Sequence, residues 1–399
     1  MSARTQADSP ELELLLLCAG VRATAGATGR IETLLGGDLN WDRLLRAAYG
    51  HGVAPLLHSR LGGFSQAMPP EVLERLRAHF GVARARNLYL AGELLKLLGV
   101  LEGHGITALP YKGPVLAVSA YGDLSLREFG DLDVLVRRRD ALGAKRALAA
   151  LGYRPWSTLD PAQEAALLRY EREYPLTREN GTVVELHWTV APAAVSFMLD
   201  CEEMWGRAVR APFGGPGVRT LSPEDTLLVL CVHGTAHLWE RLCWIRDVAG
   251  LLECPTGLDH ELLLARARAS NAKRALLLGL SLASDLLGAE LPGNIRRAAD
   301  ADGKVRVLAA RAHDRLHESL LASAVREGGT EGSERRAFQS SALDRHRDRL
   351  RYRIRRITAP GPADWEAVPL PEKLVPLYPL IRPIRLAARQ GLRLMERRA

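Results

Sequence analysis

The sequence predicts an α+β protein in which a small mixed β-sheet core is flanked by helical regions on both sides. Apolar residues recur at three- and four-residue spacing through residues 10–100 and again from Ser222 onward, which is typical of amphipathic helices. Between these regions, residues 105–200 contain short alternating runs that are typical of strands. We therefore expect four regions: an N-terminal helical region at 1–100, an α/β core at 101–215, a C-terminal helical domain at 216–326, and a linker, arginine-rich segment and basic amphipathic tail at 327–399.

Length and composition are those of an ordinary globular protein. The 399 residues suggest two or three domains, and the apolar content of 47% is enough to form sizeable cores. The 54 Lys and Arg residues exceed the 46 Asp and Glu residues, so the net charge is +8. Such an excess suits polyanionic partners, including nucleotides, RNA and anionic lipid surfaces, without selecting one of them.

Cysteine usage and the N-terminal residues predict a cytoplasmic protein. The five cysteines are odd in number and lack the close spacing of metal ligands, so we expect reduced thiols. The apolar run at residues 14–17 is too short to cross a membrane, and acidic rather than basic residues precede it. We therefore expect neither a signal peptide nor a transmembrane helix.

Residues 10–100 are expected to form a helical scaffold. Pro69-Pro70 begins a helix that continues through residues 71–100, where apolar side chains recur every three or four positions. No side chain in this region suggests a chemical role, so we assign it to packing.

Residues 109–136 are the most informative stretch, and they end in the letters GDLDVLV. Residues i and i+2 of a strand share a face, so Asp131 and Asp133 should point the same way while Leu132 and Val134 point into the core. Two adjacent like charges are costly unless a cation binds them, and carboxylate oxygens are natural ligands of Mg²⁺. The pair therefore predicts half of a site for Mg²⁺ or Mn²⁺. The alternative is a polar turn in which Asp131 bonds its own backbone.

An anion-binding turn is expected ahead of the carboxylates. Residues 105–109 read as a strand, and Lys112-Gly113 then turns into a helix with Pro114 at its start. Free backbone N–H groups at such a helix N-terminus can bind an anion, and Lys112 adds a point charge. Arg127 supplies a planar fork that suits phosphate. These are the parts that phosphoryl or nucleotidyl transfer needs, although Lys112 alone also fits a solvated turn residue and Arg127 a surface charge.

The order KG, then R, then GDLDVLV resembles the nucleotidyltransferase superfamily that includes DNA polymerase beta and the aminoglycoside nucleotidyltransferases. It resembles more closely a bacterial family of uncharacterised nucleotidyltransferases, over about residues 85–255. The resemblance implies a nucleotidyltransferase core, a divalent metal cofactor and a nucleoside triphosphate (NTP) substrate. The usual Gly-Ser pair of the superfamily is here Lys112-Gly113, and the gap to Asp131 is longer than in its compact members.

A third carboxylate is expected from a β-hairpin. Residues 174–178 and 182–188 read as two strands joined by an Asn-Gly turn, which is a strong hairpin signal. Strand periodicity puts Glu185 and His187 on one face. In the resembled superfamily a later strand supplies the third carboxylate, and Glu185 fits that position, either as a metal ligand or as the base that takes the acceptor's proton. The alternatives are an exposed hairpin residue for Glu185 and a hydrogen-bonded strand histidine for His187.

The helical domain contains one polar segment of interest. His233 and His237 are four residues apart and share a helix face, a spacing also found in zinc sites, but Gly234 stands where a metalloprotease helix carries Glu. The resembled family has a similar segment, which implies that four residues line the nucleotide or acceptor side of the site: His237, Trp239, Arg241 and Asp247. The alternative is a core helix pair with ordinary satisfied polar groups.

The C-terminal region combines a linker with two basic segments. Residues 327–334 have the composition of a flexible linker. The arginine-rich run at 345–356 fits either RNA phosphates or a solvated charged helix, and it lacks interleaved aromatic residues. The tail at 379–398 is basic and amphipathic, so it suits docking on the protein's own body, on a partner, or weakly on an anionic surface.

The sequence thus predicts a metal-dependent nucleotidyltransferase that moves a nucleoside monophosphate from an NTP to an acceptor nucleophile and releases pyrophosphate. Asp131, Asp133 and Glu185 are the expected catalytic and metal-binding residues, Lys112 and Gly113 hold phosphates, and the acceptor is a small molecule, a peptide, a protein or RNA. One alternative is an inactive nucleotide-binding or antitoxin-like interaction protein. Another is an RNA-directed nucleotidyltransferase that uses residues 345–356.

Overall fold

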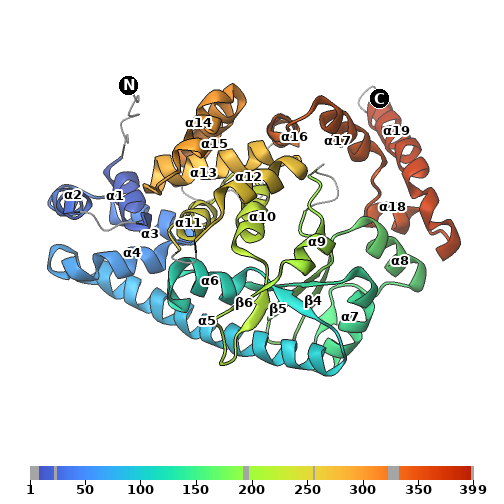
Figure 1. Ribbon diagram of the computed structural model, residues 1–399, viewed down its shortest axis with the longest axis horizontal. Helices are drawn as coiled ribbons and strands as arrows, with labels where there is room; N and C mark the ends of the chain where they lie inside the picture. Colours follow the sequence, from blue (N-terminus) through green and yellow to red (C-terminus); the bar gives the residue numbers. More distant parts are fainter. Residues whose placement is uncertain (1–8, 22–24, 192–196, 255–256, 322–331, 397–399) are drawn as a thin grey trace.

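The computed structural model describes residues 9–21, 25–191, 197–254, 257–321 and 332–396, and it has a mixed α+β fold (Figure 1). A five-stranded sheet has the order β1-β2-β5-β4-β3, and a separate hairpin pairs β6 with β7. The strands are β1 (Ala108–Pro110), β2 (Asp131–Val136), β3 (Arg154–Pro155), β4 (Glu173–Thr177), β5 (Val183–His187), β6 (Val209–Ala211) and β7 (Val218–Thr220). Strands β2 and β5 are parallel and the other pairs are antiparallel, so the expectation of a small mixed sheet is confirmed.

The β4–β5 hairpin forms where the Asn-Gly signal predicts it. Gly181 has a φ of +80°, a left-handed conformation that glycine adopts without a steric penalty. The side chain of Asn180 accepts a hydrogen bond from the backbone N–H of Thr182 at 3.1 Å, which closes the turn. This turn fixes the register of β5, and β5 in turn pairs Glu185 with Asp133 of β2.

The two faces of β2 meet different surroundings. Leu132 and Val134 are buried in a cluster with helix α5 (Pro70–Gly103) and helix α7 (Ala141–Ala149). Leu135 lies on the opposite face and belongs to a second core that includes the helical regions. Because alternate residues point to opposite faces, Asp133 points the same way as Leu135, toward the helical regions.

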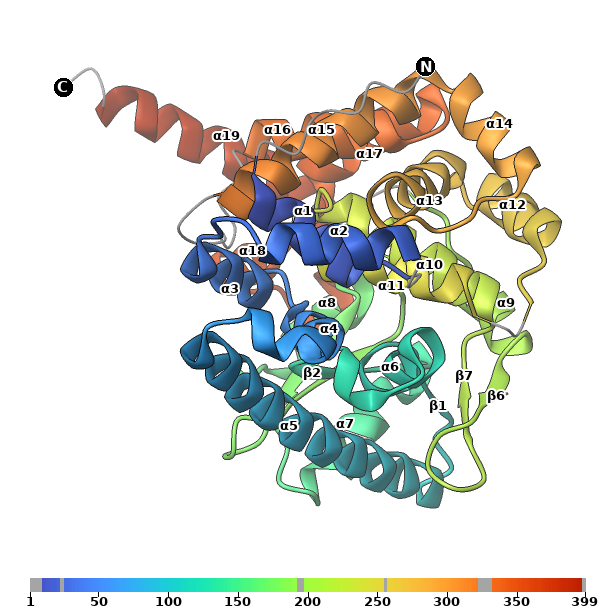
Figure 2. The ribbon, with the colours of Figure 1, turned by 90° about the vertical axis from the view of Figure 1, so that its left-hand side faces the viewer.

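Helix α5 connects both cores. Val72 and Leu76, near its start, pack in the helical core, whereas Leu94 and Leu97, near its end, pack under the sheet. The helix runs along one side of the molecule (Figures 1 and 2). It also extends across the domain boundary that we predicted at residue 100 and ends at Gly103.

Helices from both ends of the chain share the second core. Leu15, Leu45 and Leu277 belong to the same cluster although they are far apart in the sequence. The remaining helices before and within the sheet region are α1 (Pro10–Ala19), α2 (Ala25–Leu35), α3 (Trp41–Gly50), α4 (Ala54–Leu61), α6 (Gly113–Tyr121), α8 (Pro161–Tyr170) and α9 (Cys201–Gly206). Those that follow are α10 (Pro223–Ala236), α11 (Leu242–Leu252), α12 (His260–Ala269), α13 (Lys273–Leu287), α14 (Gly293–Ala301) and α15 (Gly303–Leu321). Short 3-10 helices are η1 (Gly62–Ala67), η2 (Leu124–Leu126), η3 (Arg138–Asp140) and η4 (Glu372–Leu377).

The C-terminal part is helical up to Glu396. It consists of α16 (Gly332–Ala342), α17 (His346–Thr358), α18 (Pro362–Ala367) and α19 (Tyr378–Glu396). Residues 327–331 of the predicted linker lie outside the described residues, and the last three positions of that linker begin α16. Figure 2 shows α19 projecting from the body of the molecule.

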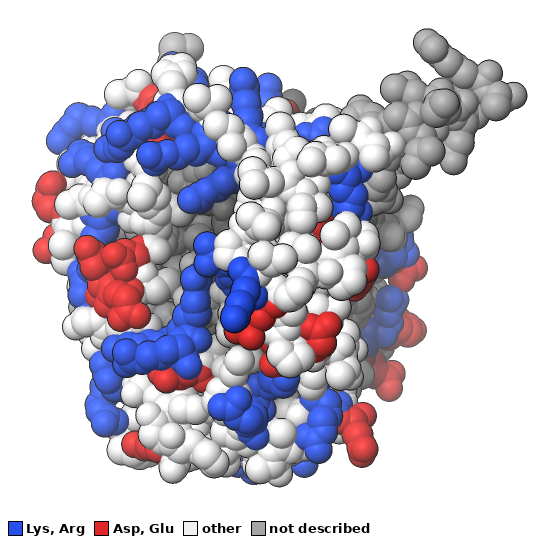
Figure 3. All heavy atoms as spheres, turned by 90° about the vertical axis from the view of Figure 1, so that its right-hand side faces the viewer, with Lys and Arg blue, Asp and Glu red and all other residues white. Residues whose placement is uncertain are grey.

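The two basic segments are helices, and neither is apolar enough to span a membrane. No described helix combines the length and the apolar character that a membrane crossing needs. On α19, Arg382 and Arg385 bind the buried carboxylate of Asp364, which fastens the start of the tail to α18, and the side chains of residues 389–399 lie outside the described part. Figure 3 views the side that carries α8, α18 and α19, where Lys and Arg side chains form separate groups interrupted by acidic and uncharged residues. The five cysteines are free thiols, as expected.

Candidate metal and phosphate site

A cluster of acidic side chains lies on the face of the sheet that points toward the helical regions. Parallel pairing of β2 and β5 sets Asp133 beside Glu185, and His187 follows two positions later on the same face of β5. His187 Nε2 lies 3.1 Å from Asp133 Oδ1 and 3.2 Å from Glu185 Oε2. Each of these three residues offers one ligand atom within 4.8 Å of the others, a spacing at which one ion can contact all three.

Asp133 is the most heavily bonded member of the cluster. Lys112 Nζ donates to its Oδ1 at 2.9 Å, and the hydroxyl of Tyr111 lies 3.5 Å from the same oxygen. Burial alone would raise the pKa of Asp133, but Lys112 and His187 together hold that pKa well below its usual range. Asp133 is therefore a buried carboxylate whose ionised form is favoured by Lys112 and His187.

Asp131 is in the opposite electrostatic situation. Burial and the neighbouring charges of Asp133 and Glu185 raise the pKa of Asp131 to about 6. No hydrogen bond or ion pair involving the side chain of Asp131 is found among the described residues. Asp131 is thus a carboxylate that gains from an added cation.

His187 has acidic groups beside both of its ring nitrogens, although only Nε2 is hydrogen-bonded. Its Nδ1 lies 3.2 Å from Glu173 Oε2, and Glu173 is held in turn by Arg172 at 2.7 Å. Although burial favours the neutral ring, the hydrogen bonds with Asp133 and Glu185 raise the pKa of His187. The sequence leaves two interpretations of His187 open, a functional residue and a hydrogen-bonded strand histidine, and it does not indicate Glu173 or Arg172. The alternation of β5 places His187 on the face of Glu185, whereas Glu173 lies one residue before the strand expected at 174–178.

The turn at Lys112-Gly113 has the geometry that an anion-binding helix start requires. Gly113 has a φ of +52° and begins α6, with Pro114 in the first turn. A Cβ atom at Gly113 would lie 3.4 Å from the carbonyl oxygen of Asp131, so this turn packs directly on the carboxylate strand. Lys112 and the first N–H groups of α6 are therefore next to Asp131 and Asp133.

Arg127 has a different role from the one predicted. Its Nε and Nη2 donate to the two carboxylate oxygens of Asp247 at 2.8 and 3.0 Å, and both side chains are buried. The hydroxyl of Tyr121 adds a third hydrogen bond to Asp247 at 2.8 Å. The planar fork that we assigned to phosphate is thus occupied by a carboxylate, and the pair joins the sheet region to α11. Asp247 is likewise a structural partner of Arg127 and not a free group facing a nucleotide.

The residues of the predicted polar segment lie in different places: His237 lies beside His233, whereas Arg241 bonds the backbone of Gly50. His237 lies beside His233 and Trp244, with ring centroids 4.6 Å and 5.4 Å away. Burial and the positive charges of Arg335, Arg172 and Lys112 lower the pKa of His237 to about 4, so the ring is neutral at physiological pH.

His233 interacts electrostatically with two residues of the acidic site, Lys112 and Asp133. Burial lowers its pKa well below the ordinary value, and the charge of Lys112 lowers it further while Asp133 acts in the opposite direction. Within the described residues, the only group of three or more side chains with metal-ligand spacing is the cluster of Asp133, Glu185 and His187. The two histidines of α10, the second of them at the end of that helix, form an aromatic surface with Trp244.

Arg241 and Trp239 lie elsewhere. Arg241 is exposed and donates to the backbone carbonyl of Gly50 at 3.3 Å. Trp239 is fully buried, and its ring packs so closely on Gly234 that a Cβ atom there would lie 2.5 Å from it. Leu238 and Trp239 both adopt left-handed backbone conformations, with φ values of 58° and 57°, which turn the chain sharply after His237. Trp239 therefore anchors the end of α10 and does not line the site.

The fold and this cluster define a class of protein: a mixed-sheet α+β protein with carboxylates on neighbouring strands, one of them buried, next to a lysine at a helix N-terminus. Comparison with protein-family models gives the more specific result. The chain belongs to the uncharacterised nucleotidyltransferase family, whose model matches residues 37–288, from α3 up to α13 and the residue after it. Searches of curated proteins and of solved structures returned no match.

Proposed function

We propose that the protein is a metal-dependent nucleotidyltransferase that moves a nucleoside monophosphate from an NTP to an acceptor nucleophile. The observation that carries this proposal is the set of Asp131, Asp133 and Glu185 on two paired strands, beside Lys112. Membership of the nucleotidyltransferase family supports the class of reaction. The resemblance to the polymerase-beta-like superfamily supports the same arrangement of carboxylates.

The donor set fits a hard divalent cation. Carboxylate oxygens are the preferred ligands of Mg²⁺ and Mn²⁺. Burial and the negative charges of Asp133 and Glu185 raise the pKa of Asp131, and they outweigh the attraction of Lys112 and Arg127. Asp133, Glu185 and His187 have ligand atoms close enough together to share one ion. Asp131 lies outside that group, two positions before Asp133 on the same face of β2, and would supply a further carboxylate. When bound, such an ion neutralises phosphate charge and makes the α-phosphorus more open to attack.

The chain's own residues would do three things in this reaction. Lys112 and the first N–H groups of α6 would bind the phosphates that leave as pyrophosphate. His187, which lies between Glu173 and the carboxylates, would keep Asp133 and Glu185 in place. As the acceptor oxygen bonds to the α-phosphorus and the bond to pyrophosphate breaks, the acceptor's proton would pass to a base, and Glu185 is the carboxylate we assign to that role or to metal binding.

The aromatic surface of His233, His237 and Trp244 suits the base of the nucleotide. Neutral imidazole and indole rings offer flat faces on which a nucleobase can stack. Of the residues that we expected to line the nucleotide side of the site, His237 keeps that proposed role, and His233 and Trp244 join it. Arg241 and Asp247 bond to other parts of the protein.

The test is nucleotide-dependent pyrophosphate release by the purified protein. Each NTP is supplied with Mg²⁺ or Mn²⁺ and with cell extract as a source of acceptor, and mass spectrometry looks for a nucleoside monophosphate adduct. Asp131→Asn and Asp133→Asn should each abolish release and adduct formation, because either change removes an anionic ligand. Asp123→Asn is the matched control, since Asp123 is an exposed carboxylate nearby that only caps η2.

The result also separates this proposal from an inactive relative. An inactive nucleotide-binding protein would bind NTP in calorimetry but would release no pyrophosphate with any NTP or either metal. Activity retained by both Asn variants would remove the proposed mechanism. A Glu185→Gln variant addresses the remaining choice, because loss of metal affinity indicates a ligand, whereas unchanged metal affinity with a lower rate indicates a base.

A further inference from the structure

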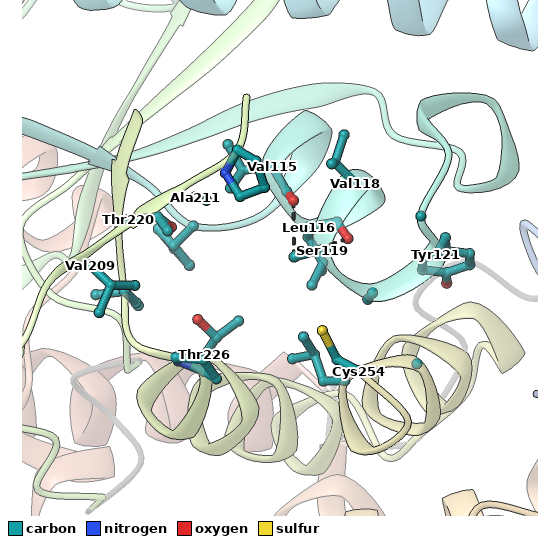
Figure 4. Close-up of a pocket in the computed structure, with 18 of the residues that line it drawn as sticks. Val115, Leu116, Val118, Ser119, Tyr121, Val209, Ala211, Thr220, Thr226 and Cys254 are labelled. Atoms are coloured by element: carbon teal, nitrogen blue, oxygen red, sulfur yellow. Dashed lines mark hydrogen bonds between the residues drawn. The ribbon is translucent and has the colours of Figure 1, made fainter. Parts of the chain in front are cut away.

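A largely apolar chamber lies away from the acidic cluster, between α6, the β6–β7 hairpin, α10 and α11. Its volume is about 420 Å³, within the range of roughly 300–1,000 Å³ that is typical of small-molecule sites. Figure 4 shows Val115, Leu116 and Val118 of α6 on one side, with Val209 and Ala211 of the hairpin on another. None of the side chains proposed above to bind metal, phosphate or base lines it.

Arg246 of α11 lies in the wall of this chamber and is only 8% exposed. Its Nε and Nη1 are buried and make no hydrogen bond within the described residues. Burial lowers the pKa of Arg246, which means that its charge is held in an unfavourable environment. A buried guanidinium without a partner is costly, so its retention calls for an explanation.

The protein's own acidic groups near Arg246 are already engaged. Asp247 is bound by Arg127 and Tyr121, and Glu253 accepts a hydrogen bond from the backbone N–H of Glu290. Both carboxylates act on Arg246 only through longer-range attraction. The guanidinium instead lies over the ring of Tyr121, 4.5 Å from its centroid. This stacking covers one face of the guanidinium and gives its Nε and Nη1 no hydrogen bond.

A second, more polar cavity of about 280 Å³ shares Arg246 and Val21 with the chamber. Arg60 also lines this cavity, and it donates to the backbone carbonyl of Gly20 at 3.1 Å. Two arginines therefore border the polar end of a space whose other end is apolar. The combination of an apolar chamber with positive charge at one end matches a molecule that has an apolar chain and an anionic head.

We propose that this chamber binds a small amphipathic carboxylate, with its apolar chain between α6 and the β6–β7 hairpin and its carboxylate against Arg246. An arginine fork binds a carboxylate through two parallel hydrogen bonds, from Nη2 and from either Nε or Nη1, so a carboxylate would satisfy one of the two nitrogens that have no partner among the described residues. Thr226, whose hydroxyl makes no hydrogen bond in the described structure, offers a further polar contact in the same wall. This binding site does not depend on the proposed nucleotidyl transfer.

The chamber and the acidic cluster share a neighbour, Tyr111, so binding in the chamber would affect the surroundings of Asp133. Tyr111 lines the chamber, and its hydroxyl lies 3.5 Å from Asp133 Oδ1. Helix α6, whose residues form one wall, begins at the Lys112-Gly113 turn. The first measurement is nevertheless binding itself, so that its outcome does not depend on an activity assay.

The experiment is isothermal titration calorimetry of the full-length protein with sodium octanoate, 1-octanol and sodium acetate. Octanoate has both the apolar chain and the carboxylate, octanol lacks the charge, and acetate lacks the chain. We expect octanoate to bind at least tenfold more tightly than either control. Equal affinity for octanoate and octanol, or no measurable binding of octanoate, would overturn the proposal.

Variants test whether Arg246 is responsible. Arg246→Met should weaken octanoate binding at least tenfold, and Val209→Asp should do the same by placing a negative charge at a partly exposed position of the wall. Arg210→Met is the matched control, because Arg210 lines the chamber from the exposed hairpin and bonds the carbonyls of Pro216 and Gly217. Its affinity should stay within twofold of the wild type. Circular dichroism confirms that each variant is folded, and unchanged binding by folded Arg246→Met or Val209→Asp would refute the assignment.

Discussion

Replacing either carboxylate of β2 by its amide should change stability in opposite directions, although the two residues are only two positions apart. Moving a pKa from its ordinary value of 3.8 to about 6 corresponds to about 3 kcal/mol of unfavourable interaction for the ionised form of Asp131. Some of this is shared with coupled neighbours, so Asp131→Asn should raise the unfolding free energy of the metal-free protein by about 1–3 kcal/mol at pH 7.5. Asp133→Asn should lower it by about 3 kcal/mol, because Lys112 and His187 lose their anionic partner in a buried site.

The assay is guanidinium-induced unfolding in the presence of a chelator, with the midpoint and slope compared between wild type and both variants. Adding Mg²⁺ and NTP should reverse the ranking of wild type and Asp131→Asn, since only the wild type gains stability from binding. If both variants were destabilised to the same degree, the electrostatic description of this pair would be refuted.

The pH dependence of the unfolding free energy provides a second test of the stability change expected for Asp131→Asn. Asp131 has a folded-state pKa above its ordinary value, so its protonated form contributes stability that is fully present below pH 3.8 and is lost as the pH rises through about 6. The advantage of Asp131→Asn should therefore be complete above about pH 7 and fall to about one third at pH 4.5. Asp133 has a lowered pKa, so its contribution is present above pH 3.8 and disappears only as the pH falls through its folded-state value. A constant advantage of Asp131→Asn from pH 4.5 to 7.5 would contradict the assignment.

Three further predictions concern buried groups outside the cluster. Arg127→Leu should lower the unfolding free energy, measured by chemical denaturation, by about 3–5 kcal/mol, because it leaves the carboxylate of Asp247 buried without its counter-charge. A loss under about 1 kcal/mol would argue against a structural role for this pair. Gly234→Ala should cost about 1–3 kcal/mol and lower the midpoint of thermal unfolding, since the added methyl group would lie 2.5 Å from the ring of Trp239; an unchanged midpoint would show that the ring can move. Arg246→Met should instead raise the unfolding free energy by about 1 kcal/mol, because it removes an unpaired buried charge and keeps apolar contact, and a lower melting temperature would mean that the charge is satisfied in the free protein.

The elements predicted from the sequence are those that depend on local geometry. The face shared by Asp131 and Asp133 follows from the two-residue period of a strand, and the hairpin follows from Asn180-Gly181, whose conformation only a few residue types adopt easily. Glu185 lies opposite Asp133 through the parallel pairing of β2 with β5, whereas the hairpin turn sets only the register of β4 against β5. The first two inferences need no knowledge of distant parts of the chain.

The elements that could not be predicted depend on contacts between distant residues. Arg127 and Asp247 are separated by 120 positions, and neither neighbourhood indicates that the other would supply its partner. Glu173 is a different case, because it faces His187 across the predicted hairpin but lies one residue before the strand expected at 174–178. The resemblance suggested roles for Arg241 and Asp247 from a sequence segment, but that segment could not show which side chains turn toward the site and which secure the helices.

Helix α5 has a consequence for how the chain can be divided. It is a continuous helix of 34 residues whose two ends pack in different hydrophobic cores. Unfolding of one core should therefore favour unfolding of the other. A truncated protein that starts at residue 101 would lack most of α5. Leu132 and Val134 would then be exposed to solvent, and the sheet would be prone to aggregate. Any attempt to express the carboxylate-bearing sheet by itself should therefore retain residues from 70 onward.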